Sequence, residues 1–198
     1  MPKKEDVQVD TKTLTLKEDE ITSMQDGLVL LPTIYINIGD DKTEAGTLID
    51  SGSTDNYIRN EFAQDLNLPK RPCKLQTHGI NGQISFNDSW VYKLSIHDKD
   101  NVEHDTIFAF GLDKIAEPES RLDQPAYEDL CSDLGIDARD VKRPSEIDFL
   151  ISNRNVELLA DRLDKVGKIG IWTGPLGVCL SGYDESKNNA CKKSLCIS

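Results

Sequence analysis

The sequence is short of the features that would point to nucleic acid, a membrane or secretion. Its 23 lysines and arginines are outnumbered by 35 aspartates and glutamates, which gives a net charge of -12. That charge argues against nucleic acid or an acidic membrane surface as an electrostatic partner. No apolar run approaches the roughly 20 residues that are needed to span a bilayer. The first six residues are mostly charged and lack the apolar core of a secretion signal.

Cysteine is also scarce, and its pattern excludes a disulfide scaffold. The five cysteines are scattered and odd in number, which is typical of a reduced, intracellular protein. Cys191 and Cys196 are not spaced as zinc ligands usually are, and no histidine lies near them. We therefore predict free thiols, no metal, no cofactor and a cytoplasmic location. The five residues are Cys73, Cys131, Cys179, Cys191 and Cys196.

The length of 198 residues suits one domain with tails. Residues 1–26 are charged and poor in apolar side chains, so we predict a flexible leader. Residues 27–182 form the predicted domain, and residues 183–198 a polar, mobile tail. Within the domain, residues 116–145 are rich in proline and acidic residues and are predicted to be a surface insertion with a helix over 127–134.

Alternating apolar residues predict that most of the domain is β-sheet. Ile34, Ile36 and Ile38 alternate with polar residues, and a longer alternation runs from Ile84 to Ile96. A polar turn then leads to a strand over 106–110, which completes a hairpin. Further strands are predicted over 47–49, 147–151 and 168–172, and short helices over 59–66 and 156–163.

One short segment carries the candidate chemistry. The apolar residues Leu48 and Ile49 lead directly into Asp50-Ser51-Gly52-Ser53. A carboxylate at the end of a buried strand is costly to desolvate without partners, whereas Gly52 permits backbone conformations that other residues avoid. The hydroxyls of Ser51 and Ser53 can orient a carboxylate. This combination favours a catalytic acid over a structural turn.

These polar residues also have simpler interpretations. An isolated Asp-Ser-Gly is most often a solvent-exposed turn, and Gly79 and Gly82 alone are ordinary turn glycines. The acidic run from Asp98 to Asp105 has Glu103 where a calcium-binding EF-hand loop needs glycine. No Gly-x-Ser-x-Gly motif of a serine hydrolase surrounds Ser51 or Ser53.

Five ordered segments resemble the retropepsin-like aspartic protease domain of BEL/Pao-type retrotransposon polyproteins. The similarity extends from about Leu28 to Gly182. The segments are Leu30-Leu31-Pro32 with Leu48 to Ser53, Tyr57-Ile58 with Leu66 to Pro69, Gly79 to Gly82, Ile147 to Ile151, and Leu176 to Gly182.

The resemblance implies a retropepsin-like barrel, mainly β with two or three short helices, that acts as a homodimeric aspartic endopeptidase. Asp50 would be the catalytic residue, and Ser51, Gly52 and Ser53 would support it. Ser51 would tie the two active-site turns together, and Ser53 would hydrogen-bond the outer carboxylate oxygen of Asp50. The substrate would be extended polypeptide, in particular the junctions of a retroelement polyprotein.

Gly79, Ile80, Asn81 and Gly82 would form the tip of a substrate-binding flap. The chain contains no internal repeat, so a two-lobed enzyme with two active-site turns in one chain is excluded. The sequence departs from the family pattern at Ser152, where glycine is typical, and at Val178, where tryptophan is typical. The alternatives are therefore a catalytically silent module that binds peptides or dimerises, and a fragment that does not fold stably alone.

Overall fold

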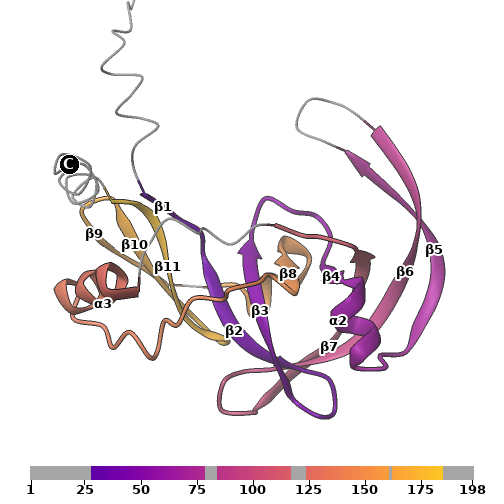
Figure 1. Ribbon diagram of the computed structural model, residues 1–198, viewed down its shortest axis with the longest axis horizontal. Coiled ribbons are helices and arrows are strands. Elements are labelled where there is room, and N and C mark those ends of the chain that lie inside the picture. Colours follow the sequence, from indigo (N-terminus) through magenta and orange to yellow (C-terminus); the bar gives the residue numbers. More distant parts are fainter. Residues whose placement is uncertain (1–27, 79–83, 117–123, 161, 185–198) are drawn as a thin grey trace, which may run out of the picture.

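The computed structural model describes residues 28–78, 84–116, 124–160 and 162–184 (Figure 1). Within these ranges the protein is mainly β with three short helices, as predicted. The strands are β1 (Leu28–Leu30), β2 (Thr33–Ile38), β3 (Thr43–Asp50), β4 (Tyr57–Arg59), β5 (Lys70–His78), β6 (Ile84–His97), β7 (Glu103–Leu112), β8 (Phe149–Ser152), β9 (Arg162–Val166), β10 (Ile169–Gly174) and β11 (Gly177–Asp184). The helices are α2 (Asn60–Asp65), α3 (Gln124–Asp133) and the 3-10 helix η1 (Asn153–Leu158).

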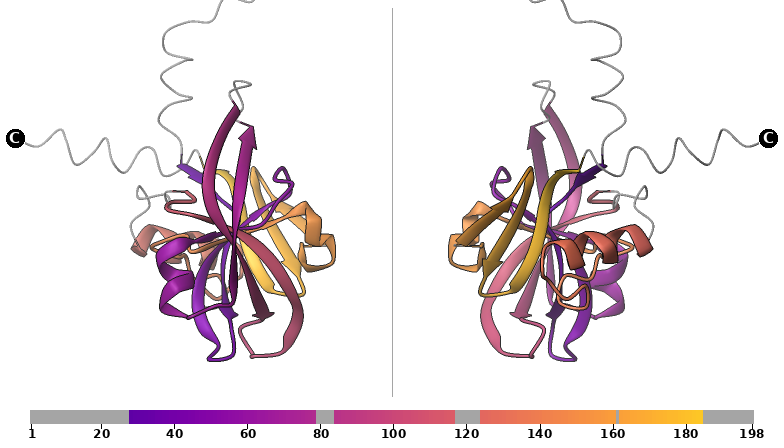
Figure 2. Two further views of the ribbon diagram at one scale, coloured as in Figure 1. Left: turned by 90° about the vertical axis from the view of Figure 1, so that its right-hand side faces the viewer. Right: turned by 90° about the vertical axis from the view of Figure 1, so that its left-hand side faces the viewer.

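Seven strands form the barrel that the sequence predicted. Their order is β2-β3-β8-β4-β7-β6-β5, and an additional pairing between β2 and β6 closes the sheet on itself. The closing pairs join Asn37 to His97 and Ile38 to Ile96. β3 and β8 run parallel to each other, as do β4 and β7. The β5–β6 hairpin continues beyond the barrel, away from the strands β9 to β11 (Figures 1 and 2).

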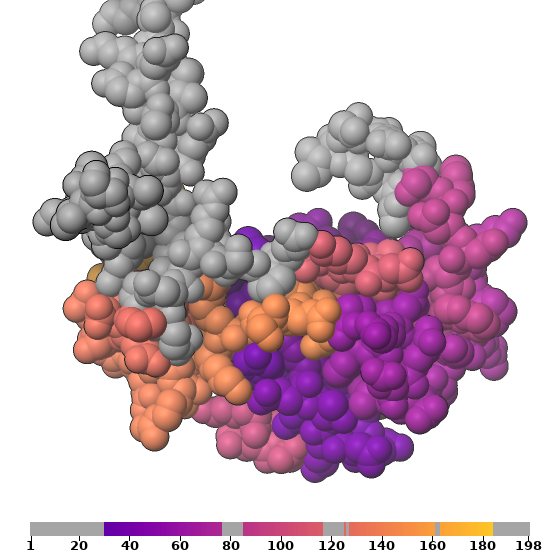
Figure 3. All heavy atoms as spheres, in the orientation of Figure 1, coloured from indigo at the N-terminus to yellow at the C-terminus, as the bar shows by residue number. Residues whose placement is uncertain are grey.

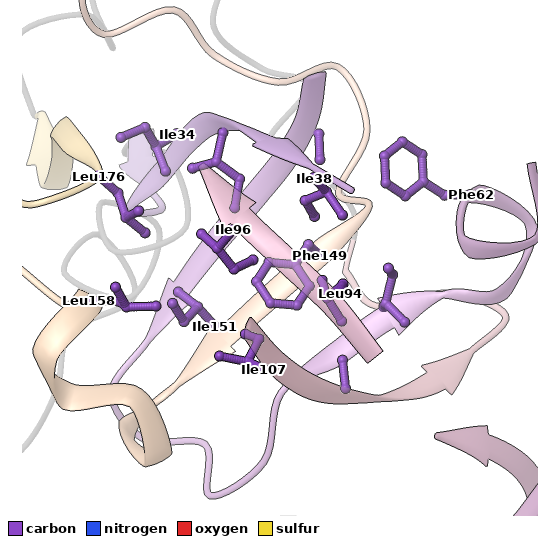
Figure 4. Packing of buried hydrophobic residues seen from close by; sticks show 14 of the residues in the cluster. Ile34, Ile38, Phe62, Leu94, Ile96, Ile107, Phe149, Ile151, Leu158 and Leu176 are labelled. Carbon is purple, nitrogen blue, oxygen red and sulfur yellow. The ribbon is translucent and has the colours of Figure 1, made fainter. Parts of the chain in front are cut away.

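The alternating residues of β2 and β6 fill the barrel. Ile36 and Ile38 of β2 and Leu94 and Ile96 of β6 are almost completely buried, together with Phe149 of β8 (Figure 4). Strands place successive side chains on opposite faces, so each of these strands lends one face to a single core. Helix α2 covers this core with Phe62 and Ala63.

A second, smaller sheet lies beside the barrel, with the order β1-β11-β10-β9. One face of it is covered by α3, because Tyr127, Leu130 and Cys131 pack with Leu30 and Leu180. The hydroxyl of Tyr127 donates to the carbonyl of Val141 at 2.6 Å. The segment that was expected to run over the surface therefore contributes a buried apolar cluster.

The helix predicted over 156–163 is wrong. The chain forms η1 over Asn153–Leu158 and then enters β9, which pairs with β10. Asn155 interrupts the helix with non-helical dihedral angles, φ -112° and ψ 57°. Leu158 is buried, whereas Val156 and Leu163 are exposed, so these apolar residues do not share one helix face.

No helix in the described parts of the chain is long and apolar enough to cross a membrane.

Candidate active site

Asp50 is the last residue of β3, and the neighbouring strand β8 fixes its position. The parallel register pairs Leu48 with Leu150 and Asp50 with Ser152. On its other side, the amide of Ile49 donates to the carbonyl of Pro32 at 2.9 Å. The backbone that carries Asp50 is therefore held from both sides before the chain turns.

In the turn after Asp50, two backbone amides donate hydrogen bonds to Asp50. The amide of Gly52 donates to Oδ1 of Asp50 at 2.9 Å, and the amide of Ser53 donates to its carbonyl at 3.2 Å. A Cβ atom on Gly52 would lie 3.2 Å from Oδ1 of Asp50, a tighter contact than side chains normally make. The Asp50 side chain is half-buried and forms no ion pair with any residue that the structure describes. The absence of a side chain at Gly52 therefore leaves room for the carboxylate of Asp50 beside this turn.

The two serines of the turn have different surroundings. Ser51 is exposed to solvent. The hydroxyl of Ser53 donates to the carbonyl of Asp55 at 2.9 Å. The resemblance implied a bond from Ser53 to the outer carboxylate oxygen of Asp50. In the single chain, the Ser53 hydroxyl instead stabilises the turn itself.

Sequence analysis missed Asn56, which links this turn to three other elements. Its side chain is 2% exposed and contacts Ser152 of β8, Phe108 of β7 and Asn155 of η1. An asparagine six residues after a candidate catalytic residue carries no recognisable motif, because its partners are about 50 to 100 residues away in sequence.

The serine at position 152, where the resemblance suggested glycine, fits its site. Ser152 is fully buried, yet its hydroxyl donates to Oδ1 of Asn56 at 3.0 Å and accepts from the amide of Arg154 at 3.2 Å. A buried hydroxyl with both bonds made costs little. The departure from the family pattern therefore does not by itself disturb the turn that holds Asp50.

An apolar row continues from Asp50 across the same face of the sheet. Asp50 lies on the same side of β3 as Leu48, and the register then joins Leu48 to Leu150, Leu150 to Tyr57 and Tyr57 to Phe110. The rings of Tyr57 and Phe110 lie with their centroids 6.4 Å apart. Burial, and next the nearby carboxylate of Asp55, raise the pKa of Tyr57, so this phenol stays neutral.

The opposite face of these strands belongs to the core. Residues that alternate with the apolar row, namely Ile151, Ile58 and Ala109, are almost completely buried. The row itself includes half-buried side chains, Leu48, Tyr57 and Phe110 among them, on the face that Asp50 shares. An extended chain that lay against this face would meet Asp50 and apolar side chains together.

An ion pair joins β4 to the residue that precedes β8, the strand that pairs with β3. Nη2 of Arg59, on β4, lies 2.8 Å from Oδ1 of Asp148, just before β8, and Nε of Arg59 donates to the same oxygen at 3.1 Å. The other oxygen of Asp148 accepts from the amide of Gly46 on β3 at 3.1 Å. The carboxylate of Asp148, just before β8, thus bonds to residues of both β3 and β4.

The predicted flap tip, Gly79, Ile80, Asn81 and Gly82, lies outside the described residues. The strands on either side of it are described, and β5 and β6 pair continuously from Lys70 with Tyr92 to His78 with Ile84. In the space-filling view, the hairpin stands above the neighbouring surface of the barrel (Figure 3). No cluster of three or more potential metal-ligating side chains occurs within the ranges that the structure covers.

Two solved structures resemble this fold at a distance. The EIAV protease complexed with the inhibitor HBY-793 aligns with 54% of this chain and 89% of its own, at 18% identity and a TM-score of 0.34. A retropepsin-like aspartic protease from Rickettsia conorii aligns with 43% of this chain and 72% of its own, at 19% identity and a TM-score of 0.28. Neither comparison supports the narrower assignment to BEL/Pao retrotransposons. No protein-family model and no curated protein sequence matches the chain.

Proposed function

We propose that the protein is an aspartic endopeptidase that hydrolyses peptide bonds in extended polypeptide. The observation that carries this proposal is the placement of Asp50. Its carboxylate is half-buried at the end of a barrel strand, accepts a hydrogen bond from the amide of Gly52, and shares a sheet face with apolar side chains.

The chemistry requires two carboxylates that share one proton. The ionised carboxylate removes a proton from water, whose oxygen attacks the carbonyl carbon, while the protonated carboxyl donates to the carbonyl oxygen. When the C–N bond breaks, the departing nitrogen receives a proton from the pair. Because the water and the two carboxyls supply every atom that is transferred, the reaction needs no cofactor.

A single chain supplies only one such carboxylate. The sequence contains one Asp-Ser-Gly. The second carboxylate would be Asp50 of another copy across a two-fold axis, so the active form would be a homodimer. The exposed Ser51 would contact the partner's turn, and Gly52 would allow the two carboxylates to approach each other. Ser53 would stabilise the conformation of the turn through its hydrogen bond to the carbonyl of Asp55.

The substrate would bind as an added strand against the face that carries Asp50 and the apolar row. Tyr57, Phe110 and Leu150 favour apolar side chains close to the bond that is cleaved. The β5–β6 hairpin, with residues 79–82 at its tip, would close over the bound peptide. The sequence resemblance adds a narrower proposal, that the substrate is a retroelement polyprotein.

Cleavage of an unfolded test protein by purified protein tests the proposal. The parent should cleave it, and a peptide mimic with a hydroxyl in place of the scissile carbonyl should inhibit the reaction. Asp50→Asn should abolish cleavage while the sedimentation of the dimer stays unchanged. Asp41→Asn removes an exposed carboxylate in the turn between β2 and β3, at the opposite end of β3 from Asp50, and should cleave as the parent does.

The pH profile gives a second check. Two coupled carboxyls predict a bell-shaped dependence of kcat/KM on pH, with two apparent pKa values that belong to the pair. If Asp50→Asn cleaves as fast as the parent, the proposal is wrong. Dimers that bind peptide but cleave nothing between pH 3 and pH 8 would instead identify a catalytically silent binding module.

A further inference from the structure

The side chain of Asn56 uses all of its hydrogen-bonding positions. Its Oδ1 accepts from the amide of Ser152 at 2.9 Å and from the hydroxyl of Ser152 at 3.0 Å. Its Nδ2 donates to the carbonyl of Phe108 at 3.0 Å and to Oδ1 of Asn155 at 2.7 Å. An asparagine amide has two acceptor and two donor positions, so none is left for water or substrate.

These partners also fix the orientation of the amide. The Ser152 amide can only donate and the Phe108 carbonyl can only accept, so the oxygen and nitrogen of Asn56 cannot exchange places without two buried mismatches. The backbone is held too, since the carbonyl of Asn56 accepts from the amide of Phe110 at 2.9 Å. Asn56 is therefore locked to β7, β8 and η1 at once.

Ser152, which donates two hydrogen bonds to Asn56, is the register partner of Asp50. Ser152 lies directly beside Asp50 in the parallel pair of β3 and β8. The next residue, Asn153, donates its amide to the carbonyl of Ser53 at 3.1 Å. The turn is thus hydrogen-bonded at Asn56 to the last residue of β8 and at Ser53 to the residue that follows it.

We infer that Asn56 and Ser152 are positioning residues that set where the Asp50 carboxylate lies relative to its partner and to the substrate. This inference rests on the proposed function. Two carboxylates share a proton only at a short, fixed separation, and a displacement of about 1 Å costs on the order of 100-fold in rate. The contacts of Asn56 make such a displacement of the turn unfavourable.

Truncation of Asn56 provides the first test. Asn56→Ala should lower kcat by roughly 10- to 100-fold and change KM by less than about threefold, because substrate contacts remain while the carboxylate is displaced. Asn60→Ala is the matched control. Asn60 also hydrogen-bonds through both ends of its amide, but its partners are Asp113 and Tyr92, and neither belongs to the turn after Asp50. The Asn60→Ala variant should keep kcat within about twofold of the parent value. Both variants are assayed well below their unfolding temperatures.

Asn56→Asp supplies a readout that loss of stability alone would not give. The introduced carboxyl would be buried with one oxygen against two acceptors, the Phe108 carbonyl and Asn155, so its pKa would be raised. Only its protonated form can donate a hydrogen there. The ratio of kcat for this variant to kcat for the parent should therefore rise as the pH falls.

Amide hydrogen exchange tests positioning without any need for cleavage. Asn56→Ala should speed exchange at Gly52 and Ser53, whose amides donate to Asp50, and Asn60→Ala should not. If the parent does not cleave but this difference appears, the proposed function fails and the positioning role stands. If the parent cleaves and Asn56→Ala matches Asn60→Ala in kcat and in exchange, or if the kcat ratio for Asn56→Asp is independent of pH, the inference is wrong.

Discussion

The ion pair between Arg59 and Asp148 should stabilise the strands around Asp50 far more than an exposed pair of similar length. The side chains of Arg59 and Asp148 are 14% and 12% exposed, and their closest atoms are 2.8 Å apart. Lys99 and Asp140 are 2.9 Å apart, but each of their side chains is 54% exposed. The two pairs therefore differ mainly in their access to water.

Asp148→Ala removes two hydrogen bonds from Arg59 and the acceptor for the amide of Gly46. Loss of one partner of a buried pair costs about 3–5 kcal/mol. Arg59 keeps contacts to the exposed carboxylates of Glu61 and Glu146, so we expect the lower end, about 3 kcal/mol. Asp140→Ala should cost less than about 1 kcal/mol.

Urea unfolding at pH 7, followed by circular dichroism, measures both free energies of unfolding. The double variant Arg59→Met/Asp148→Leu should recover much of the loss, because the buried charges are removed together. A cost for Asp148→Ala within 1 kcal/mol of that for Asp140→Ala would refute the reasoning. So would a double variant whose loss equals the sum of the losses measured for Arg59→Met and Asp148→Leu singly, since the pair would then be uncoupled.

Three further outcomes follow from the packing and ionisation of the described residues. Gly46→Ala should lower the free energy of unfolding by about 3 kcal/mol in urea titrations, because its Cβ would overlap the carbonyl oxygen of Glu146; an unchanged midpoint would contradict that packing. Burial acts to raise the pKa of Asp98, but hydrogen bonds within its turn outweigh this and hold the pKa below its usual range. The stability it contributes should be present above about pH 4 and lost as the pH falls further, so unfolding titrations of Asp98→Asn should show a shallower acid decline than the parent. Burial raises the pKa of Cys179 to about 12 and also raises that of Cys131, so mass spectrometry should find both unalkylated at pH 8 until urea unfolds the protein; rapid native labelling would show that the core is open.

The barrel strands could be predicted because their side chains alternate locally. Ile34, Ile36 and Ile38 appear in the sequence with the same period that places them in the core. The apolar residues before Asp50, Leu48 and Ile49, were recognised as a short continuous run. The helix over 156–163 failed because its apolar spacing fits a helix, although Asn155 breaks the turn and β9 pairs with β10 instead.

Long-range contacts could not be predicted from local pattern. The packing of α3 on the second sheet joins Tyr127 and Cys131 to Leu30 and Leu180, which lie far away in the sequence. Asn56 is a comparable case, since its partners lie on three other elements. Polar residues that serve as hubs in a fold have no characteristic spacing, so only the folded chain identifies them.

A mixing experiment tests the central claim, that two Asp50 carboxylates act together, most directly. Parent chains are refolded with a threefold excess of Asp50→Asn chains, and cleavage is expressed per parent chain. If both carboxylates are required, only parent–parent dimers cleave, and the activity per parent chain should fall to about one quarter. Activity per parent chain that is independent of the added variant would contradict the claim, because each Asp50 would then act alone.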